Sequence, residues 1–291
     1  MSDSLTILTR SGLDLEIAVL LADASAMAYK PSIAIKAWAK INGLTEKCVV
    51  FDHDNIQGFW CAAGDVALIC FRGTSNPGQW IRDLRLIPVE HPWGRVHAGF
   101  KGGIDIAEPD IHAFEQVAKD KKHVWVTGHS LGGALAVLAA ARLRQHGLNP
   151  FTYTYGQPRP GLGGFRDRFE SELPGRLIRF VNQSDIVPRV PPGLIYRHIG
   201  IVKTIKNLGS GLGSGGGDFG LECMGGGDES AAPPEIIDEE PPEMSEEEFA
   251  QLQASLQNES GESLEGAFDL FTDHFMTEYT RLLTEIRRLS A

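Results

Sequence analysis

The chain has 291 residues, enough for one large domain or two small ones, and its hydrophobic content of 42% is sufficient for a sizeable core. No apolar run reaches the roughly eighteen residues of a transmembrane helix, and the start "MSDSLTILTRSG" lacks the basic and apolar regions of a signal peptide. We therefore expect no membrane span, and a protein that is cytoplasmic or exported without a signal peptide.

The formal net charge of −11 is concentrated in one segment. Between Asn207 and Thr280 lie 18 of the 38 acidic residues and none of the 27 basic ones, so the other residues, with 27 basic and 20 acidic side chains, carry a net charge of +7. This distribution argues against nucleic acid as a partner of the acidic segment, and it is typical of a solvated, flexible tract.

The four cysteines show no metal-type spacing. Three of them lie on apolar, strand-like runs, which predicts buried free thiols in a reducing compartment, although the sequence leaves a disulfide open. They are Cys48, Cys61, Cys70 and Cys223.

The first elements in chain order are a helix and an antiparallel meander. Residues 13–29 have apolar positions at helical spacing, and three strand-like runs follow at 47–51, 58–63 and 66–71. The link "DHDNIQG" has some likeness to a calcium loop but lacks the distal glutamate, so we interpret it as a hairpin turn.

A short amphipathic stretch, "NPGQWIRDLRLIPV", comes next, and helices then alternate with strands. We expect a helix that Pro109 could interrupt, then three strands separated by two helices, and one further strand. The alternation predicts an α/β fold with a mostly parallel central sheet flanked by helices. The expected helices are 98–120, 131–147 and 162–173, and the expected strands are 123–128, 151–156, 176–181 and 196–205.

The composition changes at Gly209. Residues 209–260 are rich in glycine, proline and acid, which predicts a flexible insertion rather than a second domain, so we expect a single domain over residues 1–291. Within the insertion, "EEEFAQLQASLQ" has the pattern of a short exposed helix. From about Leu264 to the end, apolar positions at helical spacing predict a terminal helix that docks on the core.

The segment "VTGHSLGG" carries the clearest chemical signal. It fits the pattern Gly-x-Ser-x-Gly through Gly128, Ser130 and Gly132, and it lies between an apolar β-branched run and an Ala/Leu-rich helical run. That strand–turn–helix context is what a nucleophile elbow requires. We therefore interpret Ser130 as a nucleophile; the alternative is a Gly-rich turn with a capping serine.

A nucleophilic serine needs a base, and the base needs an acid to orient it. In elbow enzymes the chain order is serine, acid, histidine. Asp185 follows a predicted strand and is favoured over Asp167, which lies inside a predicted helix. Two histidines follow Asp185, His198 and His274, and spacing alone leaves both open as the base.

Several ordered segments together resemble the class 3 lipases, the fungal-lipase-like branch of the α/β-hydrolases. The segments, over roughly residues 13–205, are "CFRGTSNPGQWIRDL", "VHAGF", "VTGHSLGGALAVL", "YTYGQPRPG", "VNQSDIVPRVPP" and "YRHIG", with "TDHFMTEY" as a separate match. In that family the catalytic histidine lies in an Asp-His pair near the C-terminus, and the histidine of the His-x-Gly strand is structural. The resemblance therefore implies that His274, and not His198, is the base. It further implies that Thr74 and the backbone N–H of Leu131 hold the oxyanion, as the chemistry of acyl transfer also requires.

The resemblance implies a serine hydrolase that cleaves carboxylic esters of lipids, triacylglycerols or related acylglycerols, without a metal ion or organic cofactor. It also implies a lid at residues 76–88 that could bind a lipid interface; the alternative is an ordinary surface helix. A phospholipase A1, an esterase for short or aromatic esters and a non-catalytic lipid-binding protein remain alternatives, and the oligomeric state stays open. The expected lid and substrate-binding residues are Trp80, Ile81, Leu84 and Ile87.

Overall fold

The computed structural model describes residues 3–206, 233–258, 271 and 274–290 of the chain. Its centre is a sheet of eight strands in the order β1-β2-β3-β6-β7-β9-β11-β12. Strands β3, β6, β7, β9 and β11 run parallel, whereas β1, β2 and β12 are antiparallel to their neighbours, as the sequence predicts for the meander. The strands are β1 (Lys47–His53), β2 (Ile56–Ala63), β3 (Val66–Phe71), β6 (His123–His129), β7 (Phe151–Tyr155), β9 (Leu177–Asn182), β11 (Ile201–Lys206) and β12 (Glu235–Ile237).

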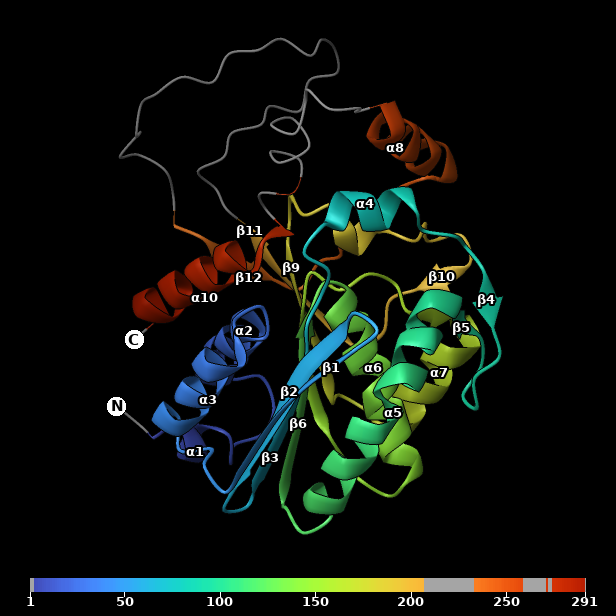
Figure 1. Ribbon diagram of the computed structural model, residues 1–291. Helices are drawn as coiled ribbons and strands as arrows, with labels where there is room; N and C mark the ends of the chain where they lie inside the picture. The colour runs from blue at the N-terminus through green and yellow to red at the C-terminus, as the bar shows by residue number, and fades with distance from the viewer. Residues whose placement is uncertain (1–2, 207–232, 259–270, 272–273, 291) are drawn as a thin grey trace.

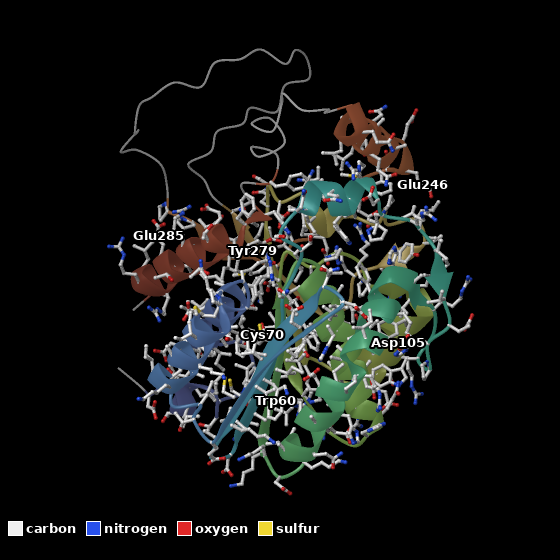
Figure 2. The ribbon with its side chains drawn as sticks, viewed as in Figure 1. Trp60, Cys70, Asp105, Glu246, Tyr279 and Glu285 are labelled. Atoms are coloured by element: carbon white, nitrogen blue, oxygen red, sulfur yellow. The ribbon has the colours of Figure 1, made fainter. Side chains whose placement is uncertain are left out.

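Helices cover both faces of this sheet, with α2, α3 and α10 on one face and α5, α6 and α7 on the other (Figure 1). Each interface is filled by its own apolar cluster; Trp60 belongs to one cluster and Cys70 to the other (Figure 2). Helices α4 and α8 lie together beyond one end of the sheet. The helices are α1 (Ser4–Ile7), α2 (Leu15–Met27), α3 (Ser32–Ile41), α4 (Pro77–Arg82), α5 (Ala98–Ala118), α6 (Leu131–Gln145), α7 (Gly163–Glu172), α8 (Glu246–Asn258) and α10 (Met276–Ser290).

The expected hairpin turn between β1 and β2 is confirmed. Asp54 and Asn55 have φ angles of 46° and 67°. Both values fall in the left-handed region, which Asp and Asn tolerate and which a two-residue hairpin requires at both central positions. Asp54 and Asn55 therefore form the turn between the paired strands β1 and β2.

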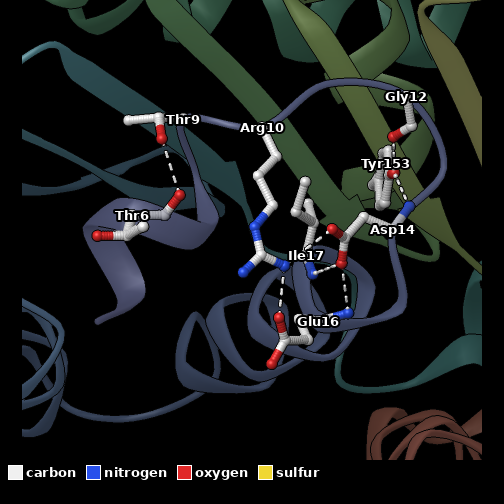
Figure 3. A network of polar contacts seen from close by, with 8 residues as sticks. All are labelled: Thr6, Thr9, Arg10, Gly12, Asp14, Glu16, Ile17 and Tyr153. Atoms are coloured by element: carbon white, nitrogen blue, oxygen red, sulfur yellow. Dashed lines mark hydrogen bonds and ion pairs between the residues drawn. The ribbon is translucent and has the colours of Figure 1, made fainter. Parts of the chain in front are cut away.

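Polar contacts fix the start of α2 against the sheet (Figure 3). The Asp14 carboxylate accepts the backbone N–H groups of Glu16 and Ile17 and so caps the helix. The hydroxyl of Tyr153, on β7, donates to the carbonyl of Gly12 and accepts the N–H of Asp14. These contacts secure the helix whose far end reaches the candidate site.

The structure corrects two expected boundaries. The predicted strand 196–205 is divided into β10 (Tyr196–Arg197) and β11, which belong to different sheets. Gly200 lies between them with a φ of 82°, which an extended strand cannot accommodate. The terminal helix begins at Met276, so His274 precedes the helix rather than lying on it; residues 264–270 of the predicted helix lie outside the described part.

Other differences lie outside the main sheet. Helix α3 was not predicted, and Pro109 does not interrupt α5. A second, four-stranded sheet forms from short segments that carry no periodicity, in the order β10-β8-β5-β4. Its further strands are β8 (Gly161–Leu162), β5 (Val96–His97) and β4 (Pro88–Val89).

Part of the predicted insertion is folded. Residues 209–232 and 259–260 lie outside the described residues, but residues 233–258 contain β12 and α8. Strand β12 pairs with β11, and the carboxylate of Glu240 forms an ion pair with the fully buried Arg179. Acidic side chains of residues 233–258 thus pair with basic groups on the core. Helix α8 is the short helix expected in this stretch, although its Phe249 and Leu256 are buried rather than exposed, and the flexibility of the insertion stays a prediction. The assignment of the whole chain to one domain stays a prediction.

The cysteines that the structure describes, Cys48, Cys61 and Cys70, are free thiols, as expected. The sulfurs of Cys48 and Cys61 lie 3.0 Å apart across β1 and β2. Cys223 lies outside the described residues. Among the described helices, none combines the length and the apolar character needed to cross a bilayer.

Candidate active site

Ser130 lies in the sharp turn between β6 and α6. Its φ and ψ are 58° and −131°, a strained backbone conformation for a residue with a side chain. A Cβ atom on Gly128 would overlap the backbone of Gly132, and one on Gly132 would overlap the carbonyl of Phe71. Both glycines of the motif are therefore required by close backbone contact, and the turn has the geometry of a nucleophile elbow.

Asp185 and His274 form a buried pair at the carboxyl ends of the parallel strands. The Nδ1 atom of His274 lies 2.9 Å from Oδ2 and 3.1 Å from Oδ1 of Asp185. Both side chains are buried, with exposed fractions of 2% for His274 and 0% for Asp185. Because a carboxylate only accepts, Nδ1 carries the proton and Nε2 is left as an acceptor, the state that a general base needs.

Two further donors hold the Asp185 carboxylate. The backbone N–H of Val187 donates to Oδ1 at 2.9 Å, and the hydroxyl of Tyr279 on α10 donates to Oδ2 at 2.7 Å. Tyr279 in turn accepts the N–H of Asn182, at the end of β9. The carboxylate thus accepts three hydrogen bonds from separate parts of the fold, which fix its orientation toward His274.

The nucleophile and the base are both sealed from solvent. Ser130 is 0% exposed, and its Oγ and the Nε2 of His274 are buried atoms without a hydrogen-bond partner among the described residues. The ring of His129, the residue before Ser130, lies against the ring of His274 with a centroid separation of 4.5 Å. The structure therefore brings the elbow and the Asp185–His274 pair together. Ligand-free sites often show such loose serine–histidine geometry, which tightens when substrate binds.

His198, the other histidine that follows Asp185, lies in a different environment. Its Nε2 contacts the carbonyl of Pro188 at 2.8 Å, so Nε2 carries the proton. Burial, with the positive charges of Arg179 and Arg159, holds the pKa of His198 well below its usual range. No hydrogen bond joins His198 to a carboxylate within the part of the chain that the structure describes. This geometry favours His274.

The two expected oxyanion donors flank Ser130. Leu131 is the first residue of α6, so its N–H has no acceptor within the helix and is available to a ligand. Thr74 follows Gly73, and a Cβ atom on Gly73 would come within 2.9 Å of the Cβ of Ser130. The Thr74 hydroxyl accepts the N–H of Asn76 at 3.2 Å, a contact that links the expected donor to the start of α4.

Two cavities meet at Thr74, which lines both. A cavity of about 250 Å³ is lined by Tyr29, His129 and His274, among others. The other, of about 480 Å³, lies between the stretch after Thr74 and the start of α5.

The expected lid forms a shorter helix than the pattern predicts. Helix α4 ends at Arg82, so Ile87 is not on its face and is instead half exposed. Trp80, Leu84 and Ile87 nevertheless all line the larger of these two cavities. Ile81 does not line that cavity; its side chain is fully buried in another cluster, which α8 shares.

Helix α8 packs directly on α4. Phe249 and Leu256 of α8 are buried in one cluster with Ile81 and Leu84. The amide nitrogen of Gln253 lies 2.9, 3.3 and 3.1 Å from the carbonyl oxygens of Ile81, Arg82 and Leu84. These carbonyls belong to the end of α4, where a helix leaves acceptors unpaired. The acidic segment therefore supplies a cap at the end of α4, the helix expected to form the lid.

Sequence reasoning missed three contributors to this site. Tyr279 was counted as an apolar position, and His129 as a variable position of the elbow motif. Tyr29 lay at the end of a predicted helix, and no contact with the site was predicted for it. A buried tyrosine generally hydrogen-bonds through its hydroxyl, which is the signal that could have marked Tyr279.

We predict that Gly156→Ala strongly lowers turnover. Gly156 has a φ of 57°, and its added Cβ would lie 2.8 Å from Asp185 Oδ2 and 3.0 Å from His274 Nδ1. A displacement of the pair should lower kcat on the order of 10²-fold. Gly175→Ala is the matched control, because Gly175 has a similar φ of 68° but no heavy atom of the described residues within 4 Å of an added Cβ. Equal kcat values for both variants would contradict the prediction.

Comparison with known proteins points to one family. Residues 68–194 match the model of "Lipase (class 3)". A lipase of Rhizomucor miehei is 43% identical over 43% of this chain and 37% of its own length, and Phospholipase A1-II 4 of Oryza sativa subsp. japonica is 34% identical over 60% and 54%. The solved structure of the Rhizomucor miehei triacylglyceride lipase is 29% identical, with a TM-score of 0.56, and the match covers 67% of this chain and 82% of that one. The chain thus spans about half or less of the length of these two sequence relatives.

Proposed function

Because this chain belongs to the class 3 lipases, the fungal-lipase-like family of the α/β-hydrolase fold, we propose that it is a serine hydrolase that cleaves carboxylic ester bonds of lipids. The observation that carries the proposal is the buried Asp185–His274 pair, which lies against the elbow of Ser130. The substrates would be triacylglycerols or related acylglycerols, in keeping with the name of the solved relative.

The proposed reaction assigns each residue of the site to defined steps. The Nε2 of His274 takes the proton of Ser130 Oγ as this oxygen attacks the ester carbonyl, and Asp185 stabilises the imidazolium that forms. The N–H of Leu131 and Thr74 hold the oxyanion; loss of one such donor costs on the order of 10²–10³ in turnover. His274 then protonates the leaving alcohol, and water activated by the same histidine releases the fatty acid. No step requires a metal ion or an organic cofactor.

We propose that α4 is the lid of this site and that α8 holds it closed. Ser130 is fully buried in this arrangement, so part of the protein must move before substrate can reach it, and we assign that movement to α4. Movement of α4 away from α8 would expose Ile81 and Leu84, which could then contact a lipid interface. Activity on a long-chain ester should consequently rise above the solubility limit of that ester.

Gln253→Ala should weaken the closed state of the lid. The variant loses the contacts to three carbonyl groups, and we expect turnover of a dissolved short-chain ester to rise roughly two- to tenfold. The control is Gln251→Ala, on the exposed side of the same helix. If both variants show the wild-type rate below the solubility limit, Gln253 does not restrain the lid.

A phospholipase A1 activity is the second candidate, and the similarity to the rice phospholipase A1 supports it. The two cavities around Thr74 do not distinguish one headgroup from another. A series of p-nitrophenyl esters of increasing chain length, a triacylglycerol emulsion and phosphatidylcholine vesicles would separate the candidates. Preference for triacylglycerol supports the first, preference for phosphatidylcholine supports the second, and hydrolysis of short esters alone indicates a carboxylesterase.

A further inference from the structure

A chain of hydrogen bonds behind the site joins three of its parts. The Nε2 of His129 lies 2.6 Å from the backbone carbonyl oxygen of His274, and its Nδ1 lies 2.8 Å from the hydroxyl of Tyr29. The Tyr29 hydroxyl also lies against Gly73, the residue before Thr74, because a Cβ atom added to Gly73 would come within 2.4 Å of that oxygen. Tyr29, at the end of α2, thus connects the oxyanion segment to the elbow and, through His129, to the segment that carries His274.

The acceptors in this chain fix the direction of every hydrogen bond. A carbonyl oxygen cannot donate, so His129 carries its proton on Nε2 and must accept at Nδ1. Tyr29 therefore donates its hydroxyl proton to His129. Burial, and secondly the neighbouring His274, hold the pKa of His129 well below its usual range, and burial raises the pKa of Tyr29 above its ordinary value. Both groups are therefore neutral and keep these roles near neutral pH.

We propose that Tyr29 and His129 are positioning residues for the reaction: they hold the backbone of His274 and the Gly73–Thr74 segment in the arrangement that ester hydrolysis requires. In this proposal neither side chain exchanges a proton with the substrate. The neutral state of His129 also matters for charge, because its ring lies 4.5 Å from the ring of His274. A second positive charge at that distance would oppose the imidazolium that forms when His274 takes the serine proton.

The inference rests on the proposed function, and Tyr29→Phe tests it with p-nitrophenyl butyrate as substrate. The variant keeps the ring and loses only the hydroxyl, so we expect kcat to fall roughly tenfold with KM little changed. Tyr153→Phe is the matched control, since Tyr153 also loses a hydroxyl bonded to backbone groups, but at the start of α2. If the Tyr29 hydroxyl had only a structural role, Tyr29→Phe and Tyr153→Phe would lose thermal stability to a similar extent and both would keep the wild-type kcat.

A second pair of variants separates hydrogen bonding from packing at His129. Glutamine and methionine have similar length, but only glutamine can donate to the His274 carbonyl. We expect His129→Gln to retain several-fold more kcat than His129→Met, although methionine suits a buried site better. If the wild type is active, equal kcat values for His129→Gln and His129→Met, or a wild-type kcat for Tyr29→Phe, would overturn this inference but leave the proposed function standing. Absence of any wild-type turnover overturns the proposed function as well.

Discussion

Replacement of Ser130 with alanine is expected to lower ester hydrolysis by a factor on the order of 10⁶, close to the uncatalysed rate. The reaction depends on the attack of Oγ at the ester carbonyl, and no other described hydroxyl lies in the elbow turn. The fold should persist, because Oγ is buried without a hydrogen-bond partner among the residues that the structure describes, and its removal leaves none of their polar groups unsatisfied. We therefore expect Ser130→Ala to unfold at or above the wild-type temperature.

A second buried serine provides the control. Ser25 on α2 is also fully buried, but its hydroxyl donates to the carbonyl of Leu21 and contacts Thr127. Ser25→Ala should lower thermal stability and leave kcat close to wild type, the reverse of the result at Ser130. Measured rates on p-nitrophenyl butyrate and thermal melts of both variants check the pair. Substantial turnover by a folded Ser130→Ala protein would exclude Ser130 as the nucleophile.

The exchange of His274 for alanine should be nearly as damaging, with kcat falling on the order of 10⁶-fold. The variant has no base to accept the Ser130 proton, and Asp185 loses the group that it orients. His198→Ala is the informative comparison, because both histidines follow Asp185 in the chain. Its loss removes one hydrogen bond to Pro188, so we expect lower stability and at most a several-fold fall in kcat. A fully active His274→Ala protein would transfer the role of base to His198.

The elbow could be predicted from the sequence because its determinants are local. Gly128, Ser130 and Gly132 lie within five positions, and the strand before them and the helix after them carry their own apolar patterns. The parallel arrangement of β3, β6, β7 and β9 follows from the alternation of helix and strand for the same reason. Asp185 could be chosen by chain order and by its place after a strand.

The choice of His274 did not follow from residue physics. Two histidines satisfied the chain order, and the resemblance to a family distinguished them. In the structure the decision is made by tertiary contacts, since the turn before α10 places His274 against Asp185 over a separation of 89 residues. Strand periodicity also failed to divide residues 196–205, because the break at Gly200 depends on its close contact with Leu177.

The residues that hydrogen-bond to the candidate catalytic residues and their backbone were the hardest to predict from the sequence. Tyr29, His129 and Tyr279 are far apart in sequence, and each contributes a single polar atom that no periodic pattern records. The cap that Gln253 places on α4 likewise joins residues about 170 positions apart, within a segment whose composition predicted flexibility. Composition describes the average solvation of such a segment, not the few contacts that fix it on the core.

Ser130, His274 and Asp185 are proposed to act together as one nucleophilic centre. Reaction of the whole protein with a fluorophosphonate probe, followed by peptide mapping, tests it most directly, because this probe reports an activated serine whatever the natural substrate is. We expect one covalent adduct, located on Ser130, and loss of that adduct in His274→Ala but not in His198→Ala. A folded wild-type protein that forms no adduct, or that carries it on another serine, would contradict the claim.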